Sequence, residues 1–432
     1  MTTLEKIKLI SQLNKQLLLS KNIHIGLFWL NSLIVFVMLA ASVNYPTAFY
    51  YACISLCLLS LFALLLRTDN QSLSKLEKVM ILTWLSYPLL TLLDFWLRTG
   101  WSWPEFQESS RFILVVPIFL MVRRFGISKD AIKWGVFVGA LFAGVWALYQ
   151  KQVIGIHRAF GGTSSLAHAF GDISLLLGFM SVALFQPNWS KNWRWSFIVL
   201  IPLSLGVFAS LASGTKGGWI SVPILCWIMV TLVRHPSYVK RFAVQAVVAT
   251  GAVLLWYFLP FIQARVGNIP HEINAYFETN KVNGSAGHRL ALWHAAMLIF
   301  IDNPLFGTGV NSYAVAKIPF LESGLVPSSV SGDIGVHNQF FKALVEFGLL
   351  GLISVASIYG VFIMNCRQYI QENKGLAITG LFLAVGFIDF GLVESIWGIN
   401  NAGVFFTVML ALISGQLAYE KKHYRQHHYL TS

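Results

Sequence analysis

The chain has 432 residues, of which 56% are hydrophobic and 11% are charged, and its formal net charge is +13. So large an apolar fraction cannot be hidden in one globular core, which excludes an ordinary water-soluble domain and indicates that lipid is the solvent. The positive charge does not indicate a nucleic-acid partner, because the basic residues are distributed as expected of a membrane protein.

The N-terminal 24 residues place leucine and isoleucine among lysines at helical spacing, which predicts an amphipathic helix on the inner membrane surface, with a plain cytoplasmic tail as the alternative. Twelve apolar runs follow, near 25–43, 45–66, 79–97, 109–123, 132–153, 168–186, 195–212, 218–233, 241–262, 340–365, 375–391 and 398–418. They lack the ten-residue alternation of a barrel, so they predict an all-α polytopic membrane protein.

Charge predicts how the chain is oriented. If the N-terminus is cytoplasmic, 21 of the 31 basic residues fall in inner segments, and an even number of spans keeps them on one face. The predicted organisation is residues 1–24 as a cytoplasmic segment, 25–262 with transmembrane helices 1 to 9, 263–339 as a large outer loop with short helices, 340–418 with transmembrane helices 10 to 12, and 419–432 as a cytoplasmic tail. The four cysteines show neither CxxC spacing nor a histidine partner, so neither a disulfide framework nor a zinc site is predicted.

Ten basic residues remain on the outer side: Arg98, Arg111, Lys151, Arg158, Lys216, Arg265, Lys281, Arg289, Lys317 and Lys342. A cation that opposes the topology rule needs compensation, and an anionic ligand is the simplest source. For Arg98, Lys281 and Lys317 we expect instead a solvated or ion-paired surface.

Two short outer connections carry basic residues among small ones. The turn from Ala212 to Trp219 surrounds Lys216 with glycines and hydroxyls, which favours an anion cradle over a turn with a snorkelling lysine, and it does not match a nucleotide-binding P-loop. The connection from Gly155 to His168 is similar. Arg158 there is a candidate for an anionic head group, and His168 is a weaker one, since a histidine at a span end is commonly bonded to a neighbour.

The large outer loop carries the remaining candidates. Helical spacing predicts a helix from Ala286 to Ile301, ended by Asn303-Pro304, and Arg289 on it has the guanidinium geometry to grip phosphate oxygens. Trp293 shares its face and is retained as a substrate-binding candidate, although such an apolar stripe is more typical of packing. Arg265 lies just past the ninth run, at the membrane boundary.

His337 is the candidate general base, because it stands directly before the tenth run with Asn338 as the predicted N-cap. Asn338 is also a candidate for substrate binding. We expect the helix dipole and nearby arginines to disfavour the imidazolium and leave a neutral imidazole. The alternative is a purely structural histidine. The outer segments contain no DxD, HExxH or paired-carboxylate pattern, so no metal and no cofactor is predicted.

Three motifs together resemble the O-antigen ligase and polymerase superfamily of bacterial envelope enzymes. They are the turn from Ser213 to Trp219, the stretch from Arg289 through Trp293 to Asn303-Pro304-Leu305-Phe306-Gly307-Thr308-Gly309, and His337-Asn338 ahead of the segment from Leu344 to Gly351. The resemblance implies a GT-C-like fold of twelve transmembrane helices with a periplasmic loop, in the bacterial inner membrane. It implies metal-independent, inverting transfer of a glycan from undecaprenyl pyrophosphate, with His337 activating the acceptor and Arg289 and Arg265 holding the pyrophosphate. Lys216 stands where the family usually has arginine.

The motifs do not distinguish acceptors. The chain stops some 15 residues beyond its last run, whereas protein O-oligosaccharyltransferases of the superfamily tend to be longer, which favours an O-antigen ligase acting on lipid A-core. An O-antigen polymerase is the closest alternative, and a polyprenyl-glycan transporter is the alternative from another class. We expect both termini in the cytoplasm, the site facing the periplasm, and membrane lipids as further partners.

Overall fold

The computed structural model describes residues 3–66, 72–162, 167–189, 194–215, 217–232, 263, 267–279 and 282–431. Within these residues it contains helices and connecting segments and no strand. The helices are α1 (Thr3–Ala41), α2 (Pro46–Leu65), α3 (Lys75–Asp94), η1 (Phe95–Thr99), α4 (Trp103–Phe125), α5 (Lys129–Tyr149), η2 (Gln150–Ile154), α6 (Ala167–Trp189), α7 (Arg194–Ser213), η3 (Gly217–Trp219), α8 (Ser221–Leu232), α11 (Ile269–Thr279), α12 (Gly284–Asp302), α13 (Tyr313–Ala316), α14 (Ile318–Glu322), η4 (Ser328–Val330), α15 (Gln339–Gln368), α16 (Lys374–Val393) and α17 (Asn400–Thr431).

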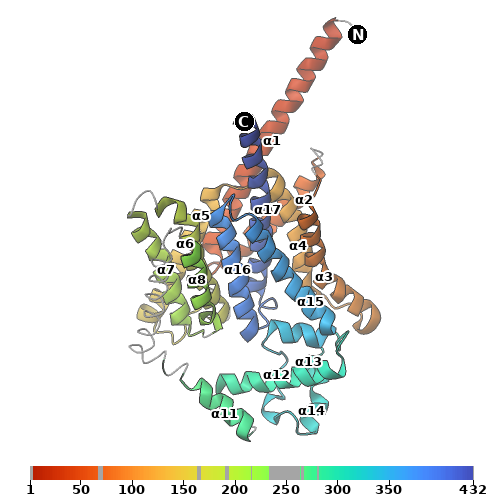
Figure 1. The fold of residues 1–432 in the computed structure, drawn as a ribbon, viewed down its shortest axis with the longest axis vertical. Coiled ribbons are helices and arrows are strands. Elements are labelled where there is room, and N and C mark those ends of the chain that lie inside the picture. The colour runs from red at the N-terminus through yellow and green to blue at the C-terminus, as the bar shows by residue number, and fades with distance from the viewer. Residues whose placement is uncertain are drawn as a thin grey trace.

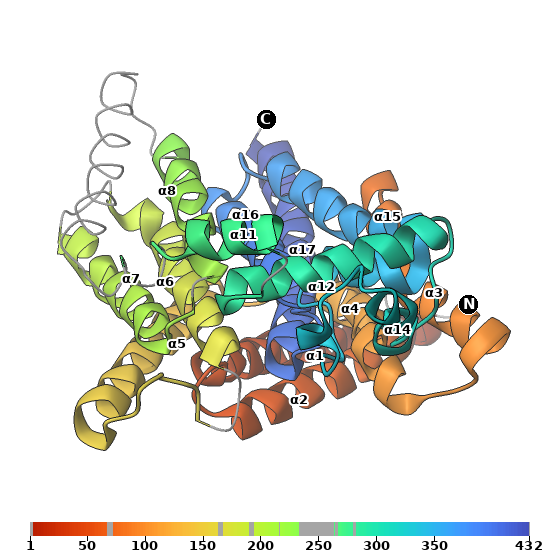
Figure 2. The same cartoon turned by 90° about the horizontal axis from the view of Figure 1, so that it is seen from below.

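Long helices form a bundle, and shorter ones lie across one of its ends. Figure 1 shows α11 to α14 below the bundle, while α1 begins and α17 ends at the opposite end. Seen from below in Figure 2, α12 crosses the bundle end from the side of α6 toward the side of α3. We call this end, covered by α11 to α14, the capped end.

Eight of the described helices are long and apolar enough to cross a membrane, and two shorter apolar helices span Ile198–Ser213 and Gly217–Met229. The chain is therefore a multi-pass membrane protein. Of the twelve predicted runs, eleven coincide with helices α1 to α8 and α15 to α17, and the run at 241–262 lies outside the described residues. A count of twelve spans and a periplasmic location for residues 263–339 stay predictions.

Burial identifies the helices at the centre of the bundle. The apolar window of α6 is 89% buried, that of α17 is 83% buried and that of α16 is 72% buried, whereas those of α1 and α2 are 33% buried. Helices α6, α16 and α17 therefore contact protein on most sides, and α1 and α2 present much of their surface to the surroundings.

Glycines let α5, α6 and α7 approach closely. A Cβ atom at Gly206 of α7 would lie 2.5 Å from the carbonyl oxygen of Ser174 in α6, and one at Gly144 of α5 would lie 2.3 Å from the Cβ of Leu205. Small residues at helix contacts are typical of membrane bundles, where van der Waals packing provides much of the association energy.

The two terminal helices continue beyond the predicted spans. Residues 3–41 form one helix with no break near residue 24, and Figure 1 shows its first part projecting beyond the bundle. At the other end of the chain, α17 continues to Thr431, through the segment predicted as a tail. How the first helix lies relative to a membrane surface stays a prediction.

Helix α12 confirms the helix predicted in the outer loop. It begins two residues earlier and ends one residue later than expected, and Asn303 follows it. One face is buried in a separate apolar cluster at the capped end, which includes Ala291, Leu292, Ala295 and Ile299. This packing fixes α12 and so fixes the position of Arg289, near its first turn.

Helix α15 is broken inside its membrane-spanning length. Gly348 has φ 61° and ψ −147°, which interrupts the helical hydrogen bonds. Backbone groups freed in this way need new partners in a lipid environment.

The Asn303 to Gly309 turn provides those partners. Three backbone hydrogen bonds join it to the break: Thr308 N–H to Val345 C=O at 2.8 Å, Gly309 N–H to Glu346 C=O at 3.0 Å, and Leu349 N–H to Pro304 C=O at 2.8 Å. The turn approaches so closely that a Cβ atom at Gly307 would lie 2.5 Å from the Val345 carbonyl oxygen. The two motifs noted in the sequence are therefore the two halves of one contact, which lies a short distance along α15 from His337.

Candidate active site

His337 is held by a carboxylate at the capped end. Its Nδ1 lies 2.8 Å from Oε1 and 3.0 Å from Oε2 of Glu394, which directly follows α16. The residue adopts φ 51°, a left-handed conformation that costs a non-glycine residue of order 1–3 kcal/mol and persists only where the surroundings impose it. Because Nδ1 faces the carboxylate, the proton of the neutral imidazole belongs on Nδ1. Nε2 is then the atom able to accept a proton.

Asn338, the residue next to the candidate base, is held in place by the hydrogen bonds of its side chain. Its Oδ1 accepts hydrogen bonds from the backbone N–H groups of Phe340 at 2.9 Å and Phe341 at 3.0 Å, which confirms the predicted N-cap. Its Nδ2 donates to the carbonyl of Leu392 at 2.9 Å. Asn338 thus ties the start of α15 to the end of α16, a positioning role, and direct contact with substrate stays a prediction.

Arg289 reaches the same helix end from α12. Its Nε donates to the carbonyl of Val393, the last residue of α16, at 3.1 Å. Among the described residues, no carboxylate oxygen lies within 4.0 Å of the Arg289 guanidinium, so these residues form no salt bridge with it. Burial lowers the pKa of the guanidinium, while the charges of Glu394 and Glu272 act in the opposite direction. The group stays charged, because an arginine pKa lies far above neutral pH.

Arg158 makes the equivalent contact with another helix end. Its Nε donates to the carbonyl of Ser213, the last residue of α7, at 2.8 Å. Both arginines therefore cap the C-terminus of a helix, where the helix dipole favours a cation.

His168, in the first turn of α6, connects these groups. Its imidazole lies within electrostatic range of Glu394, Arg158, Arg289 and His337. Five ionisable groups from five separate chain segments therefore converge at the capped end of the bundle. The arrangement combines a histidine oriented by a carboxylate, with Nε2 able to accept a proton, and two arginines bound to helix ends.

Trp293 has a different environment. Its ring stacks on Phe341 of α15, with ring centroids 5.8 Å apart and planes 23° apart, and it packs against the apolar cluster under α12. This is the packing role that its apolar stripe favours. A role in substrate binding gains no support from this contact.

Two candidates, Lys216 and Arg265, lie outside the described residues. The residues that flank position 216 are described: Thr215 donates its hydroxyl to the Ala167 carbonyl at 3.2 Å, and a Cβ atom at Gly217 would lie 2.3 Å from Val393. Both flanking residues therefore pack against helices that carry other members of the site.

The expected direction of the His337 pKa shift was wrong, although Arg289 acts as expected. The hydrogen bond to Glu394 raises the pKa of His337 above its ordinary value, whereas burial and the charge of Arg289 act in the opposite direction. For Glu394, burial acts to raise the pKa, but the hydrogen bond and charge of His337 hold it below its ordinary value. The prediction considered the helix that follows His337 and missed the carboxylate beside it. Glu394 is the member of the candidate site that sequence reasoning did not assign, although it is one of few carboxylates in the predicted outer segments.

Several outer basic residues have protein partners and need no ligand. Lys317 is 0% exposed and donates to the carbonyls of Val330, at 2.6 Å, and Asp333, so the expected solvated or ion-paired surface was wrong for it. Arg111 donates to the Trp397 carbonyl at 2.6 Å. Lys342 pairs with two glutamates in a separate pocket.

Comparisons with known proteins agree with the resemblance seen in the motifs. Residues 201–356 match the family described as O-antigen ligase, a region that contains Arg289 and His337. Over 410 residues the chain is 26% identical to an uncharacterized protein of Haemophilus influenzae, covering 92% of this chain and 99% of that protein. Over 248 residues it is 21% identical to a protein of Rickettsia conorii named "Putative polysaccharide ligase", covering 55% of each chain. The family match confirms the resemblance.

Proposed function

We propose, on the premise that residues 201–356 match the family described as O-antigen ligase, that the chain is an inverting glycosyltransferase that moves O-antigen glycan from undecaprenyl pyrophosphate to a hydroxyl of lipid A-core. The observation that carries the proposal is the His337–Glu394 pair, with Nδ1 held at 2.8 Å from the carboxylate. The reaction takes place on the periplasmic face of the inner membrane and uses protein side chains alone.

The pair suits the first step, activation of the acceptor. Nε2 of His337 takes the proton as the acceptor O–H bond breaks, and the imidazolium that forms is stabilised by Glu394. The acceptor oxygen forms a bond to the anomeric carbon on the face opposite the leaving group, which inverts that carbon. A side chain that is 41% exposed leaves room for this approach.

The arginines suit the second half of the reaction, departure of the leaving group. The bond between the anomeric carbon and the pyrophosphate oxygen breaks, and the electron pair leaves with undecaprenyl pyrophosphate. Arg289 and Arg158 place positive charge near this developing anion, and preorganised charge of this kind is commonly a large contribution to catalysis. Arg265 and Lys216 complete the proposed set of cations.

Reconstitution tests the proposal. Purified protein in liposomes is mixed with an undecaprenyl-pyrophosphate-linked O-antigen and with lipid A-core, and the products are separated by size. We expect glycan on lipid A-core with the wild type, none with His337→Ala, and wild-type yield with His271→Ala, which removes an exposed histidine of α11.

Each other result has a defined meaning. Elongated glycan that remains on undecaprenyl pyrophosphate would show that the protein is a polymerase. Translocation of the donor without a new glycosidic bond would show that it is a transporter. Substantial ligation by a folded His337→Ala protein would refute the assignment of the base. Thermal unfolding of that variant in detergent shows whether it is folded.

A further inference from the structure

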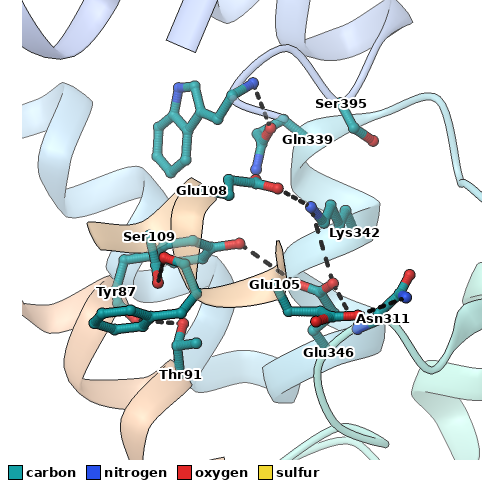
Figure 3. Close-up of polar contacts among 12 residues, drawn as sticks. Tyr87, Thr91, Glu105, Glu108, Ser109, Asn311, Gln339, Lys342, Glu346 and Ser395 are labelled. Atoms are coloured by element: carbon teal, nitrogen blue, oxygen red, sulfur yellow. Dashed lines mark hydrogen bonds and ion pairs between the residues drawn. The ribbon is translucent and has the colours of Figure 1, made fainter. Parts of the chain in front are cut away.

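A polar pocket lies beside the start of α15, on the side of α3 and α4. Its volume is about 230 Å³, and its polar lining includes Glu105, Glu108, Asn311, Lys342 and Glu346. Figure 3 shows these side chains facing one another between α4, α15 and the segment that carries Asn311. We call it the α4 pocket. None of its residues takes part in the proposed transfer.

The charges inside the α4 pocket limit what it can bind. The Lys342 ammonium contacts the Glu108 carboxylate and lies 3.9 Å from that of Glu346, so it occupies the place a metal ion would need. The three carboxylates outnumber the Lys342 ammonium and the Arg111 guanidinium, which lies within electrostatic range of Glu108 and Lys342. The net charge is therefore negative and repels phosphate groups. A neutral ligand with hydroxyl groups fits this environment.

Unpaired polar atoms line this pocket or lie beside it. Glu105 Oε2 and Glu108 Oε1 are buried and have no hydrogen-bond partner, and the same holds for Nε2 of Gln339, a residue that is 0% exposed. Figure 3 shows this nitrogen directed toward Glu108. Buried polar groups nearly always have partners, so two acceptors and one donor here indicate positions for the polar groups of a ligand. A sugar hydroxyl both donates and accepts, which matches the mixture.

The position of the α4 pocket indicates which sugar enters it. Figure 1 and Figure 2 both place α3 and α7 on opposite sides of α16, and Arg158 is bound to the end of α7. In an inverting transfer the acceptor approaches opposite the leaving pyrophosphate. On the proposed function, the arginines mark the donor side. Helices α3 and α4 are therefore on the acceptor side of His337.

We propose that the α4 pocket binds one sugar ring of the acceptor saccharide through its hydroxyl groups. Its volume is below the roughly 300–1,000 Å³ of sites for drug-sized ligands, which limits the ligand to a single ring. The exposed Asn311 stands at the mouth, and its backbone N–H is fixed by the Glu346 carboxylate at 3.0 Å. The proposal rests on the proposed function, because it names part of the acceptor of that reaction.

Two substitutions test the pocket without disturbing its ion pairs. Glu105→Ala removes an unpaired carboxylate oxygen, and Asn311→Gly removes the side chain at the mouth while glycine tolerates the local φ of 56°. Asp302→Ala is the matched control, since it removes an exposed carboxylate of α12 outside the pocket. The acceptor KM should rise about 10-fold in Glu105→Ala, as expected for loss of a hydrogen bond to a charged group, and about 3-fold in Asn311→Gly, where the lost hydrogen bond is neutral. The kcat and the donor KM should stay within about 2-fold.

The KM values for the acceptor and for the donor together decide which sugar the α4 pocket binds. A raised donor KM would move the pocket to the donor glycan, and unchanged kinetics or a fall in kcat alone would refute a sugar subsite. Equilibrium binding separates this inference from the proposed function: lipid-free core oligosaccharide is bound to the His337→Ala protein and followed by saturation-transfer NMR. Binding that Glu105→Ala weakens and Asp302→Ala leaves intact supports the pocket even if the wild type transfers no glycan. Transfer with no such binding refutes the pocket alone.

Discussion

Gly348 should not tolerate a side chain, and alanine at this position tests whether the break in α15 holds the loop in place. A Cβ atom there would lie 2.5 Å from the carbonyl carbon of Leu305 and 2.6 Å from the carbonyl oxygen of Pro304. Both are backbone atoms, so no side-chain rotation relieves the clash. The turn from Asn303 to Gly309 must then move away from α15.

The magnitude follows from the contacts that are lost. The three backbone hydrogen bonds between turn and helix contribute about 1 kcal/mol each. Alanine at φ 61° and ψ −147°, a region adopted almost only by glycine, costs about 1–3 kcal/mol more, for a total of about 4–6 kcal/mol. With an unfolding entropy of about 2.1 cal/mol/K per residue, 432 residues give about 0.9 kcal/mol/K, so the unfolding temperature should fall by about 4–7 °C.

Thermal unfolding of the purified protein in detergent, followed by intrinsic fluorescence, measures this change. Gly360→Ala on the same helix is the control, because no heavy atom lies within 4 Å of a Cβ at Gly360. The control should not lower the unfolding temperature by more than about 1 °C, because alanine is more favourable than glycine in a helix interior. Equal unfolding temperatures for the two variants would refute the role of the turn.

Three further predictions concern the active site. Glu394→Gln should lower kcat about 10²- to 10⁴-fold, because an amide N–H donated to Nδ1 of His337 moves the ring proton to Nε2, and a rate within about 3-fold of wild type would contradict the orientation. The wild-type rate should fall as pH decreases through the pKa of His337, which lies above its ordinary 6.5, and the acidic limb should move to lower pH in Glu394→Gln, where the cause of the raised pKa is removed. A limb that stays in place would assign it to another group. Arg289→Lys should raise the donor KM about 10-fold, because an ammonium cannot hold the Val393 carbonyl and a phosphate in the fork geometry of arginine, and an unchanged donor KM would place the pyrophosphate elsewhere.

Local features of the site were predictable from the sequence. The spacing of apolar residues predicted α12 to within two residues, and Asn338 was recognised as an N-cap, because both depend on interactions within a few residues of the chain. The apolar runs likewise predicted helices wherever the structure describes them. Each of these features depends on a period or on a short motif.

Features that depend on tertiary packing were not predictable in the same way. Glu394 lies 57 residues from His337 in the chain, and no local signal links them. Without this partner, the helix dipole and the nearby arginines gave the wrong direction for the pKa of His337. The break at Gly348 was interpreted as part of a continuous span, and the Asn303 to Gly309 turn as a helix stop, because nothing in either segment shows that each completes the hydrogen bonds of the other.

The anchoring of Arg289 and Arg158 at helix ends has a consequence for turnover. Each guanidinium is already partly neutralised by the negative end of a helix, and its long side chain is already ordered before any ligand arrives. On the proposed function, such a cation binds an arriving pyrophosphate at a smaller entropic cost, and it also holds the departing one less tightly than an unshared charge would. The ends of α7 and α16 then control the rate of product release as well as the strength of donor binding.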